Sequence, residues 1–292
     1  MICVLQDMKF YKYQGAGNDF LIADNRNGVI REDGGVLYGE DGWSRSIAEL
    51  CDRRYGVGAD GLMLLEGSSE HDFRMVYYNS DGSGGMMCGN GGRCIVAFAA
   101  DCGIEHFDFD AADGFHTAEI LQSDGGVKTV RLKMKDVLLC QKYEALTGPG
   151  VNSEGYFLDT GTRHYVRFVK GLKEYDIVGE GREIRFKAQE LLPVGANVNF
   201  VEPSDVTVNV RTYEKGVEDE TFACGTGIVA CCIASYVMGV KPAEISADGR
   251  VSYAVNAKRD ALAVDFLPGT SGLVAEDVWL TGPATYVAEV IV

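Results

Sequence analysis

Two segments of the chain are apolar on almost every side, and each follows a Cys-Gly-x-Gly turn. Residues 93–102 read RCIVAFAADC and residues 227–238 read GIVACCIASYVM. A helix without a polar face must be enclosed by other elements. We therefore expect each segment to form a helix that runs through the middle of its own curved sheet, which requires two lobes.

Alternation of apolar and polar residues predicts the strands of these sheets. In the clearest case, residues 127–135, the last five residues read RLKMK. An amphipathic helix is expected after Ser46, which opens a capping-box pattern, with Gly56 as its stop. Further strands are expected at residues 8–13, 61–66, 72–78, 164–170, 206–213, 260–267 and 285–292.

The predicted fold class is α+β, with two pseudo-symmetric lobes that are each a curved, mostly antiparallel β-sheet wrapped around a central apolar helix. Cys88 and Cys224 lie 136 residues apart, and a polar residue closes a strand before each of them, Asn79 in one copy and Glu214 in the other. Internal repeats of this kind usually form two domains with a site between them. We place the junction near residue 133, and the last strand could pair with either lobe.

Charge and hydropathy exclude two classes of partner. The formal net charge is −16 and the sequence has no Lys/Arg-rich run, whereas nucleic-acid binding needs a clustered basic surface. The longest apolar segment, which begins at Gly227, is shorter than the roughly 20 residues that span a bilayer. The N-terminal residues MICVLQDMKF lack the pattern of a secretory signal. We expect no nucleic-acid partner, no membrane association and a cytoplasmic protein.

The cysteines also fit a reducing cytosol. Nine cysteines, an odd number without a dense framework, argue against a disulfide scaffold. A zinc site fails on spacing, because Cys88 and Cys94 are six residues apart and no Cys-x-x-Cys pair exists. Most of the thiols are expected to be core residues.

The two cysteines at the glycine turns are different, because a helix N-terminus stabilises anions and lowers the pKa of a nearby thiol. The glycines leave backbone N–H groups open to a carboxylate or phosphate. If the two turns serve one amino acid, one thiolate could remove its α-proton while the other thiol protonates the opposite face. That is two-base racemisation, and it needs no redox cofactor.

Three other interpretations remain open at this point. The turns could serve packing or capping alone, although two copies that each open an apolar helix are harder to dismiss than one. Cys88 and Cys224 could form the disulfide of a redox dithiol protein, which would leave the doubled anion-binding turns unexplained. A phosphate- or nucleotide-binding module would need only the turns, but no Walker-type Lys-Ser/Thr or strand-borne GxGxxG stands out.

Eight motifs together closely resemble the diaminopimelate epimerase family, whose members are cofactor-independent enzymes of lysine and peptidoglycan precursor synthesis. The resemblance runs from about Met8 to the end of the chain. The motifs are GAGNDF (15–20), GVGADG (56–61), YNSDGS (78–83), CGNGGRC (88–94), ANVNF (196–200), RTYEKG (211–216), ACGTG (223–227) and TGPA (281–284).

The resemblance implies a lobed fold in which residues 1–133 plus 281–292 form the N-terminal lobe and residues 134–280 the C-terminal lobe, with the active site in the cleft between them. It implies that Cys88 and Cys224 are the acid/base pair, with Cys224 accepting and Cys88 donating the proton in the L,L to meso direction. It implies an amino-acid substrate and no PLP or metal, and a homodimer is compatible with the sequence.

The resemblance also assigns binding roles. Backbone amides at the two turns would hold the α-carboxylate, and polar side chains would recognise the ammonium groups and the distal carboxylate. The amides are those of Gly89, Asn90, Gly225 and Thr226, and the side chains are those of Asn18, Asn79, Thr162, Asn197, Glu214 and Lys215. His164 and Glu214 resemble residues that tune the two thiols. Taken alone, His164 would be interpreted as a core or edge histidine, Glu214 as a strand-end charge in solvent, and the asparagines as turn caps.

Three positions depart from the common pattern of the family. Thr162 replaces an asparagine in a Gly-Asn-Pro-His motif, Lys215 stands where arginine is usual, and Gly61 stands where some members have a substrate-contacting glutamine. Arginine and lysine differ in geometry, since only arginine presents a planar fork. These departures motivate an alternative prediction, a racemase of the same fold that acts on another amino acid.

Overall fold

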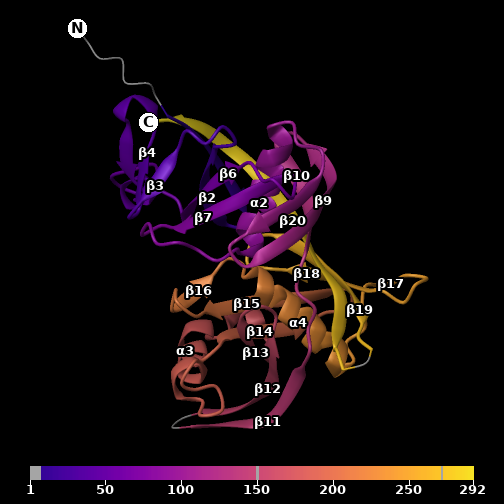
Figure 1. The fold of residues 1–292 in the computed structure, drawn as a ribbon. Coiled ribbons are helices and arrows are strands. Elements are labelled where there is room, and N and C mark those ends of the chain that lie inside the picture. Colours follow the sequence, from indigo (N-terminus) through magenta and orange to yellow (C-terminus); the bar gives the residue numbers. More distant parts are fainter. Residues whose placement is uncertain (1–7, 149–150, 271) are drawn as a thin grey trace. The chain divides into compact units, whose positions relative to one another are not determined.

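The computed structural model describes residues 8–148, 151–270 and 272–292, so the N-terminal segment assessed for a signal lies largely outside the described residues. The chain divides into two compact units. The N-terminal unit consists of the chain up to Leu132 together with Pro283–Val292, and the C-terminal unit is Lys133–Gly282. Figure 1 shows that strands dominate in both, so the predicted α+β class is confirmed.

The N-terminal unit has one large sheet, one small sheet and two α-helices. The large sheet contains β1 (Lys9–Gly15), β2 (Asn18–Asp24), β6 (Gly61–Glu66), β7 (Phe73–Asn79), β8 (Phe107–Ala111), β9 (Gly114–Asp124) and β10 (Val127–Lys133). The small sheet contains β3 (Arg31–Asp33), β4 (Val36–Tyr38) and β5 (Ser44–Ser46). The helices are α1 (Ile47–Cys51) and α2 (Gly89–Asp101), with a 3-10 turn, η1, at Glu40–Gly42.

The C-terminal unit repeats the plan of a sheet with an enclosed helix. Its strands are β11 (Cys140–Gly148), β12 (Val151–Asp159), β13 (Arg163–Phe168), β14 (Asn197–Pro203), β15 (Thr207–Glu214), β16 (Asp219–Thr221), β17 (Glu244–Ile245), β18 (Val251–Asn256) and β19 (Ala261–Pro268). Its helices are α3 (Ile177–Lys187) and α4 (Gly225–Met238), with a 3-10 turn, η2, at Leu172–Glu174. The last strand, β20 (Ala275–Ile291), pairs with β19 through its first half and with β1 through its second half.

Strand pairing shows how far the internal repeat extends. In the N-terminal unit the pairs β1–β2, β6–β7, β8–β9 and β9–β10 are antiparallel, whereas β2–β6 and β7–β8 are parallel. In the C-terminal unit β12–β13, β14–β15, β18–β19 and β19–β20 are antiparallel, whereas β13–β14 and β15–β18 are parallel. The order of orientations is the same, so the two units share a topology and not only a motif.

The two apolar helices are enclosed as predicted. Helix α2 packs against β1, β2, β6 and β9, and α4 packs against β13, β14 and β15. Every residue of α2 from Gly89 to Ala99 is buried. The expected starts at residues 93 and 227 are wrong, because the helices begin at Gly89 and Gly225. The glycine-rich residues form the first helical turn, and each cysteine is the N-cap.

Two smaller helices differ from expectation for local reasons. Helix α1 ends at Cys51, because the Asp52 carboxylate accepts the backbone N–H groups of Arg54 and Tyr55 and so competes with further helical bonds. Helix α3 was not expected from apolar periodicity. The signal for α3 is its N-cap, since the Asp176 carboxylate accepts the Gly179 N–H at 2.9 Å.

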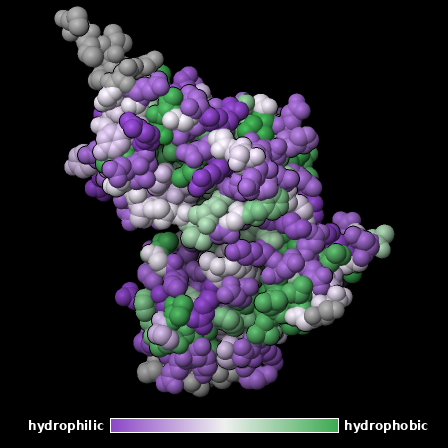
Figure 2. Space-filling view, viewed as in Figure 1, coloured by the Kyte–Doolittle hydropathy of each residue, from purple (hydrophilic) through white to green (hydrophobic). Residues whose placement is uncertain are grey.

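The surface agrees with the acidic, polar composition. On the face drawn in Figure 2, hydrophilic residues predominate in both units and hydrophobic residues form scattered groups. No helix among the described residues is long and apolar enough to cross a bilayer.

Candidate active site

The N-terminal half-site is built on the first turn of α2. Cys88 is the N-cap, and its sulfur accepts a hydrogen bond from the Gly91 N–H at 3.2 Å. The thiol is half-buried. A side chain at Gly91 would approach this sulfur, since a Cβ there would lie 3.2 Å from it. Because Gly91 has no side chain, its backbone N–H can approach the Cys88 sulfur without a steric contact.

A chain of side-chain hydrogen bonds connects this turn to β2 and to the interior of α2. Asn90 donates to the Asn18 side-chain oxygen at 2.6 Å, and its own side-chain oxygen accepts from the Arg93 guanidinium at 2.9 Å. Arg93 is fully buried and also donates to the carbonyl oxygens of Gly89 and Pro283. The predicted residues Asn18 and Asn90 are thus brought together, and Arg93 orders the backbone beside the cysteine.

Asn18 is held from its other side by charged residues. Its side-chain amide donates to Asp60 at 3.0 Å, and Arg53 bridges Asp60 and Asp19. Lys12 forms a second ion pair with Asp19 at 2.8 Å. Burial alone would raise the pKa of Asp19, but the hydrogen bonds from Arg53 and Lys12 lower it below its usual value. This network fixes which end of the Asn18 amide faces Asp60 and which faces the turn.

Gly61 does not leave an open space beside its backbone. A Cβ at Gly61 would lie 2.5 Å from the Tyr77 ring and 2.6 Å from the Tyr78 carbonyl oxygen. Burial raises the pKa of the Tyr77 hydroxyl well above its usual value, and the Cys88 sulfur contributes electrostatically to that increase. The Tyr77 side chain therefore fills this part of the half-site.

Asn79 ends β7, as predicted, but its contacts are with the following turn. Its side-chain amide donates to the Ser83 hydroxyl at 3.0 Å, and its backbone N–H donates to the Ser83 carbonyl oxygen. The Asp81 carboxylate accepts from the Ser83 hydroxyl. These contacts are those of a turn cap, and the ligand role of Asn79 stays a prediction.

The C-terminal half-site repeats the arrangement on α4 with different side chains. Cys224 is the half-buried N-cap, and its sulfur lies 3.5 Å from the Thr226 hydroxyl. Thr226 is in turn 3.1 Å from the Thr162 hydroxyl and 3.0 Å from His164 Nε2, and Thr162 is 2.9 Å from the same nitrogen. The structure therefore joins Cys224, Thr226, Thr162 and His164 in one network.

His164 is a fully buried histidine whose ring orientation is set by its neighbours. The Asn199 amide donates to Nδ1 at 3.1 Å, so Nε2 carries the proton and donates to the threonine hydroxyls. Asn199 is itself held, because its oxygen accepts from the Thr212 hydroxyl. Burial lowers the pKa of His164 to about 3, and the hydrogen bond from Asn199 opposes this only in part. The ring is therefore neutral at physiological pH.

The remaining predicted residues of this unit lie at the ends of β14 and β15. Asn197, at the start of β14, contacts both neighbouring strands. Its side-chain amide donates to the Arg163 carbonyl oxygen in β13, and its side-chain oxygen accepts the backbone N–H of Lys215, directly after β15. The Glu214 carboxylate accepts from the Thr221 hydroxyl at 2.8 Å. The Lys215 side chain is exposed at the start of the β15–β16 turn. The ligand roles of these residues stay predictions.

Four residues with structural roles in the half-sites were not predicted: Asp60, Tyr77, Arg93 and Asn199. Three of them stand inside motifs already quoted, GVGADG, CGNGGRC and ANVNF. The exception, Tyr77, directly precedes YNSDGS. The available signal was a charged or amide residue in an otherwise apolar stretch, since such groups are buried only with partners. Arg93 within an apolar helix is the clearest example.

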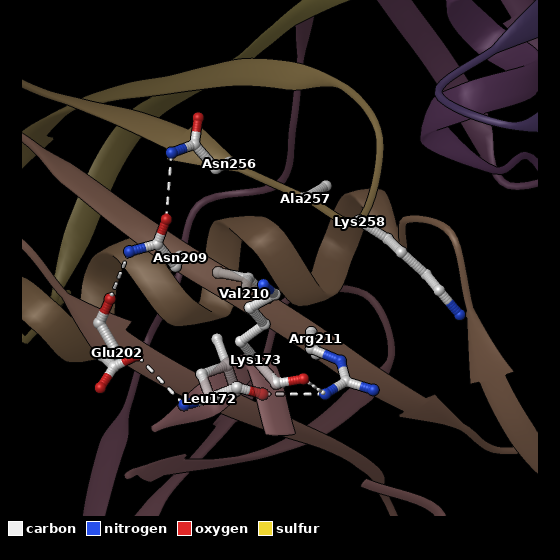
Figure 3. Close-up of a pocket in the computed structure, with 9 residues that line it drawn as sticks. All are labelled: Leu172, Lys173, Glu202, Asn209, Val210, Arg211, Asn256, Ala257 and Lys258. Atoms are coloured by element: carbon white, nitrogen blue, oxygen red, sulfur yellow. Dashed lines mark hydrogen bonds between the residues drawn. The ribbon is translucent and has the colours of Figure 1, made fainter. Parts of the chain in front are cut away.

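One cavity of the C-terminal unit is lined by polar groups that already have partners. A cavity of about 400 Å³ in the C-terminal unit is lined in part by Arg211, Asn209 and Asn256, and Figure 3 shows these groups bonded to each other or to the protein. Arg211 is held by Glu220 at 2.7 Å and by the Leu172 carbonyl oxygen. Among the described residues, no group of three or more His, Cys, Asp or Glu side chains could hold a metal ion.

Comparison with known proteins places the chain in a family. A sequence model of diaminopimelate epimerase matches residues 10–135 and 156–261. The diaminopimelate epimerase of Flavobacterium psychrophilum is 40% identical over 285 residues, covering 97% of this chain and 99% of that protein. That of Aquifex aeolicus is 37% identical, covering 97% and 96%. A phenazine biosynthesis protein of the PhzF family from Bacillus anthracis shares the fold, with a TM-score of 0.71, 14% identity and 99% coverage of both chains. The chain belongs to the diaminopimelate epimerase family.

Proposed function

We propose that this chain is a cofactor-independent isomerase that converts L,L-diaminopimelate to the meso form with Cys88 and Cys224 as its acid/base pair. The observation that carries the proposal is that both units have the same kind of helix start. In each unit a half-buried cysteine caps a helix whose first turn is glycine-rich. The relatives named diaminopimelate epimerase support the choice of substrate.

The first task of such a site is to stabilise a carbanion next to a carboxylate. The first turn of a helix presents backbone N–H groups without intrahelical acceptors and carries partial positive charge. We assign the α-carboxylate to the N–H groups of Gly89, Asn90, Gly225 and Thr226. Negative charge that develops on this carboxylate as the α-proton leaves is stabilised by these fixed donors more strongly than in the ground state.

The second task is to exchange one proton for another. In the L,L to meso direction the Cys224 thiolate accepts the α-proton and the Cys88 thiol donates its proton to the opposite face of the same carbon. One C–H bond breaks, one forms, and no electrons are transferred to a cofactor. In the reverse direction the roles are exchanged. His164 and Glu214 are proposed to tune the two thiols.

Recognition of the rest of the substrate is proposed for polar side chains around the two turns: Asn18, Asn79, Thr162, Asn197, Glu214 and Lys215. The family departures bear on this assignment. Thr162 bonds inward to His164 and Thr226, and Tyr77 occupies the space beside Gly61. These contacts motivate a comparison of diaminopimelate with other amino acids. A cytoplasmic location is proposed because reactive thiols persist in reducing compartments.

The test is α-proton exchange in deuterated water with a panel of amino acids. Deuterium should enter the α-position of diaminopimelate, with conversion between the L,L and meso forms, and should not enter the other amino acids. Cys88→Ser and Cys224→Ser should each abolish epimerisation. Cys102→Ser, at the other end of α2, is the matched control and should remain active. Exchange into a different amino acid alone would make the chain a racemase of other specificity, and no exchange with any substrate would refute the proposal.

A further inference from the structure

We infer that Asn199 is a positioning residue for the reaction, because it fixes the direction of a chain of hydrogen bonds. The chain runs through His164 and ends with the Thr226 hydroxyl donating to the Cys224 sulfur. The inference deepens the proposed function and rests on it for its catalytic meaning. The direction of the hydrogen bonds can be measured without substrate.

The orientation of the Asn199 amide is set by a backbone group. Its side-chain nitrogen lies 3.1 Å from the Tyr165 carbonyl oxygen and 3.1 Å from His164 Nδ1. A carbonyl oxygen can only accept a hydrogen bond, so this end of the amide must be the NH2 group. The other end, the side-chain oxygen, accepts from the Thr212 hydroxyl at 2.9 Å. Every polar group of this fully buried side chain therefore has a partner.

The amide in turn sets the tautomer of His164. Because Asn199 donates to Nδ1, that nitrogen must be the unprotonated one, and the ring proton lies on Nε2. Burial agrees with this assignment, since it lowers the pKa of the ring and keeps it neutral. Nε2 is therefore a donor toward the Thr162 hydroxyl at 2.9 Å and the Thr226 hydroxyl at 3.0 Å.

This tautomer determines which way the threonine hydroxyls point. Since Nε2 donates, neither hydroxyl can give its proton to the ring. When Nε2–H is donated to Thr162, the Thr162 hydroxyl donates to Thr226 at 3.1 Å, and the Thr226 proton is left for the Cys224 sulfur at 3.5 Å. With the opposite tautomer the hydroxyls would donate toward the ring, and the Thr226 oxygen would accept from the thiol. A hydrogen bond donated to the sulfur favours the thiolate, so the direction bears on proton transfer at Cys224.

The internal repeat shows that the fold does not require these polar side chains. Asn199 pairs with the residue two positions before the end of β15, and Met63 pairs with the residue two positions before the end of β7. His164 pairs with the residue two positions before Asn199, and Phe20 with the residue two positions before Met63. Met63 and Phe20 are therefore the equivalents of Asn199 and His164, and both are buried and apolar. A buried amide and imidazole cost free energy unless they are fully bonded, so their presence in one unit indicates a role in its half-site.

The Asn199–His164 pair lies directly against the first turn of α4. A Cβ at Gly227 would lie 2.5 Å from the Asn199 side-chain oxygen and 3.2 Å from His164 Cε1. At the equivalent Gly91 a Cβ would lie 3.5 Å from the sulfur of Met63. The glycine of α4 thus leaves room for the polar pair close to the turn that carries the proposed acid/base residue.

Nuclear magnetic resonance of the full-length protein with nitrogen-labelled histidine tests the direction. The protonated and unprotonated nitrogens of a neutral imidazole resonate far apart, so the spectrum reports the tautomer. His164→Asn identifies the signals of His164 by their loss. We expect Nε2 protonated and Nδ1 unprotonated at neutral pH. Asn199→Asp should place a proton on Nδ1, because a carboxylate is a weaker base than imidazole and accepts where the amide donates.

Kinetic measurements connect the direction with the reaction. Asn199→Asp should lower kcat about 10-fold or more in the wild-type background, but much less in Thr226→Val, because two residues that act through one chain are not additive. Thr162→Val should lower kcat less than Thr226→Val, since Nε2 can donate directly to the Thr226 hydroxyl at 3.0 Å. Ser153→Ala is the control, because it removes a buried hydroxyl 3.2 Å from that of Tyr165 in the same unit. It should leave the nitrogen spectrum and kcat unchanged.

Three results would overturn the inference: a protonated Nδ1 in the wild type, a tautomer that Asn199→Asp does not change, or equal losses of kcat from Asn199→Asp in the two backgrounds. Urea unfolding shows whether each variant folds. If Asn199→Asp does not, the wild-type spectrum and the order of the Thr162→Val and Thr226→Val rates decide. The expected tautomer in a chain without epimerase activity would refute the proposed function, whereas an active epimerase with a protonated Nδ1 would refute this inference alone.

Discussion

The protonation state of His164 gives a quantitative test of the C-terminal half-site. Its ring is fully buried and bonded to uncharged partners, and burial lowers its pKa to about 3 from an ordinary value of 6.5. Between these two pH values the unfolded chain binds a proton at this ring and the folded chain does not. The stability contributed by the neutral ring is therefore complete above pH 6.5 and is lost as the pH falls toward 3.

The magnitude follows from the two pKa values. At pH 5 the imidazole of the unfolded chain is protonated in about a 30 to 1 ratio, which favours unfolding by roughly 2 kcal/mol relative to pH 8. This is a sizeable share of the 5 to 15 kcal/mol that typically stabilises a folded protein. Carboxylates titrate over a similar range, so the comparison must be with a variant that differs only at this ring.

His164→Asn provides that variant, since its side chain does not titrate. Urea unfolding of both proteins at pH 8 and pH 5, followed by circular dichroism, gives four free energies of unfolding. We expect the wild type to lose about 2 kcal/mol more than the variant on acidification. The Cε1–H nuclear magnetic resonance signal of His164 should not titrate between pH 8 and pH 5. Equal losses in the two proteins, or a ring that titrates above pH 5, would refute the argument from burial.

Three further substitutions test the geometry of the half-sites. Gly227→Ala should lower the free energy of unfolding by about 1 to 3 kcal/mol and reduce kcat, because the added Cβ would lie 2.5 Å from the Asn199 side-chain oxygen. Urea unfolding and steady-state kinetics measure both effects. Gly84→Ala is the control, because a Cβ at Gly84 would meet open space. Thr226→Val removes the hydroxyl beside the Cys224 sulfur and should reduce kcat about 10-fold or more, with recovery in the Ser variant. Unchanged kinetics would contradict a role of this hydroxyl in the reaction. Asp60→Ala should raise KM about 10-fold, because the Asn18 amide loses its charged acceptor. A fall in kcat with an unchanged KM would contradict a role of Asp60 in orienting Asn18 for substrate binding.

The fold was predictable because two constraints agreed. An apolar helix needs enclosure, and its repetition after the same cysteine motif indicated two equivalent sheets. The helix starts were not predictable from the same pattern. Glycine is a poor helix former, so the residues after Cys88 and Cys224 suggested a turn, whereas packing within the sheet holds them in the first turn of α2 and α4. Tertiary burial overrides propensity at these positions.

The site was predictable in its motifs but not in the contacts beneath them. Asn18 and Asp60 are separated by 42 positions, and Arg93 and Pro283 by 190, so no local pattern could pair them. The contact between Gly61 and the Tyr77 ring likewise depends on the pairing of β6 with β7, which the motif GVGADG does not disclose.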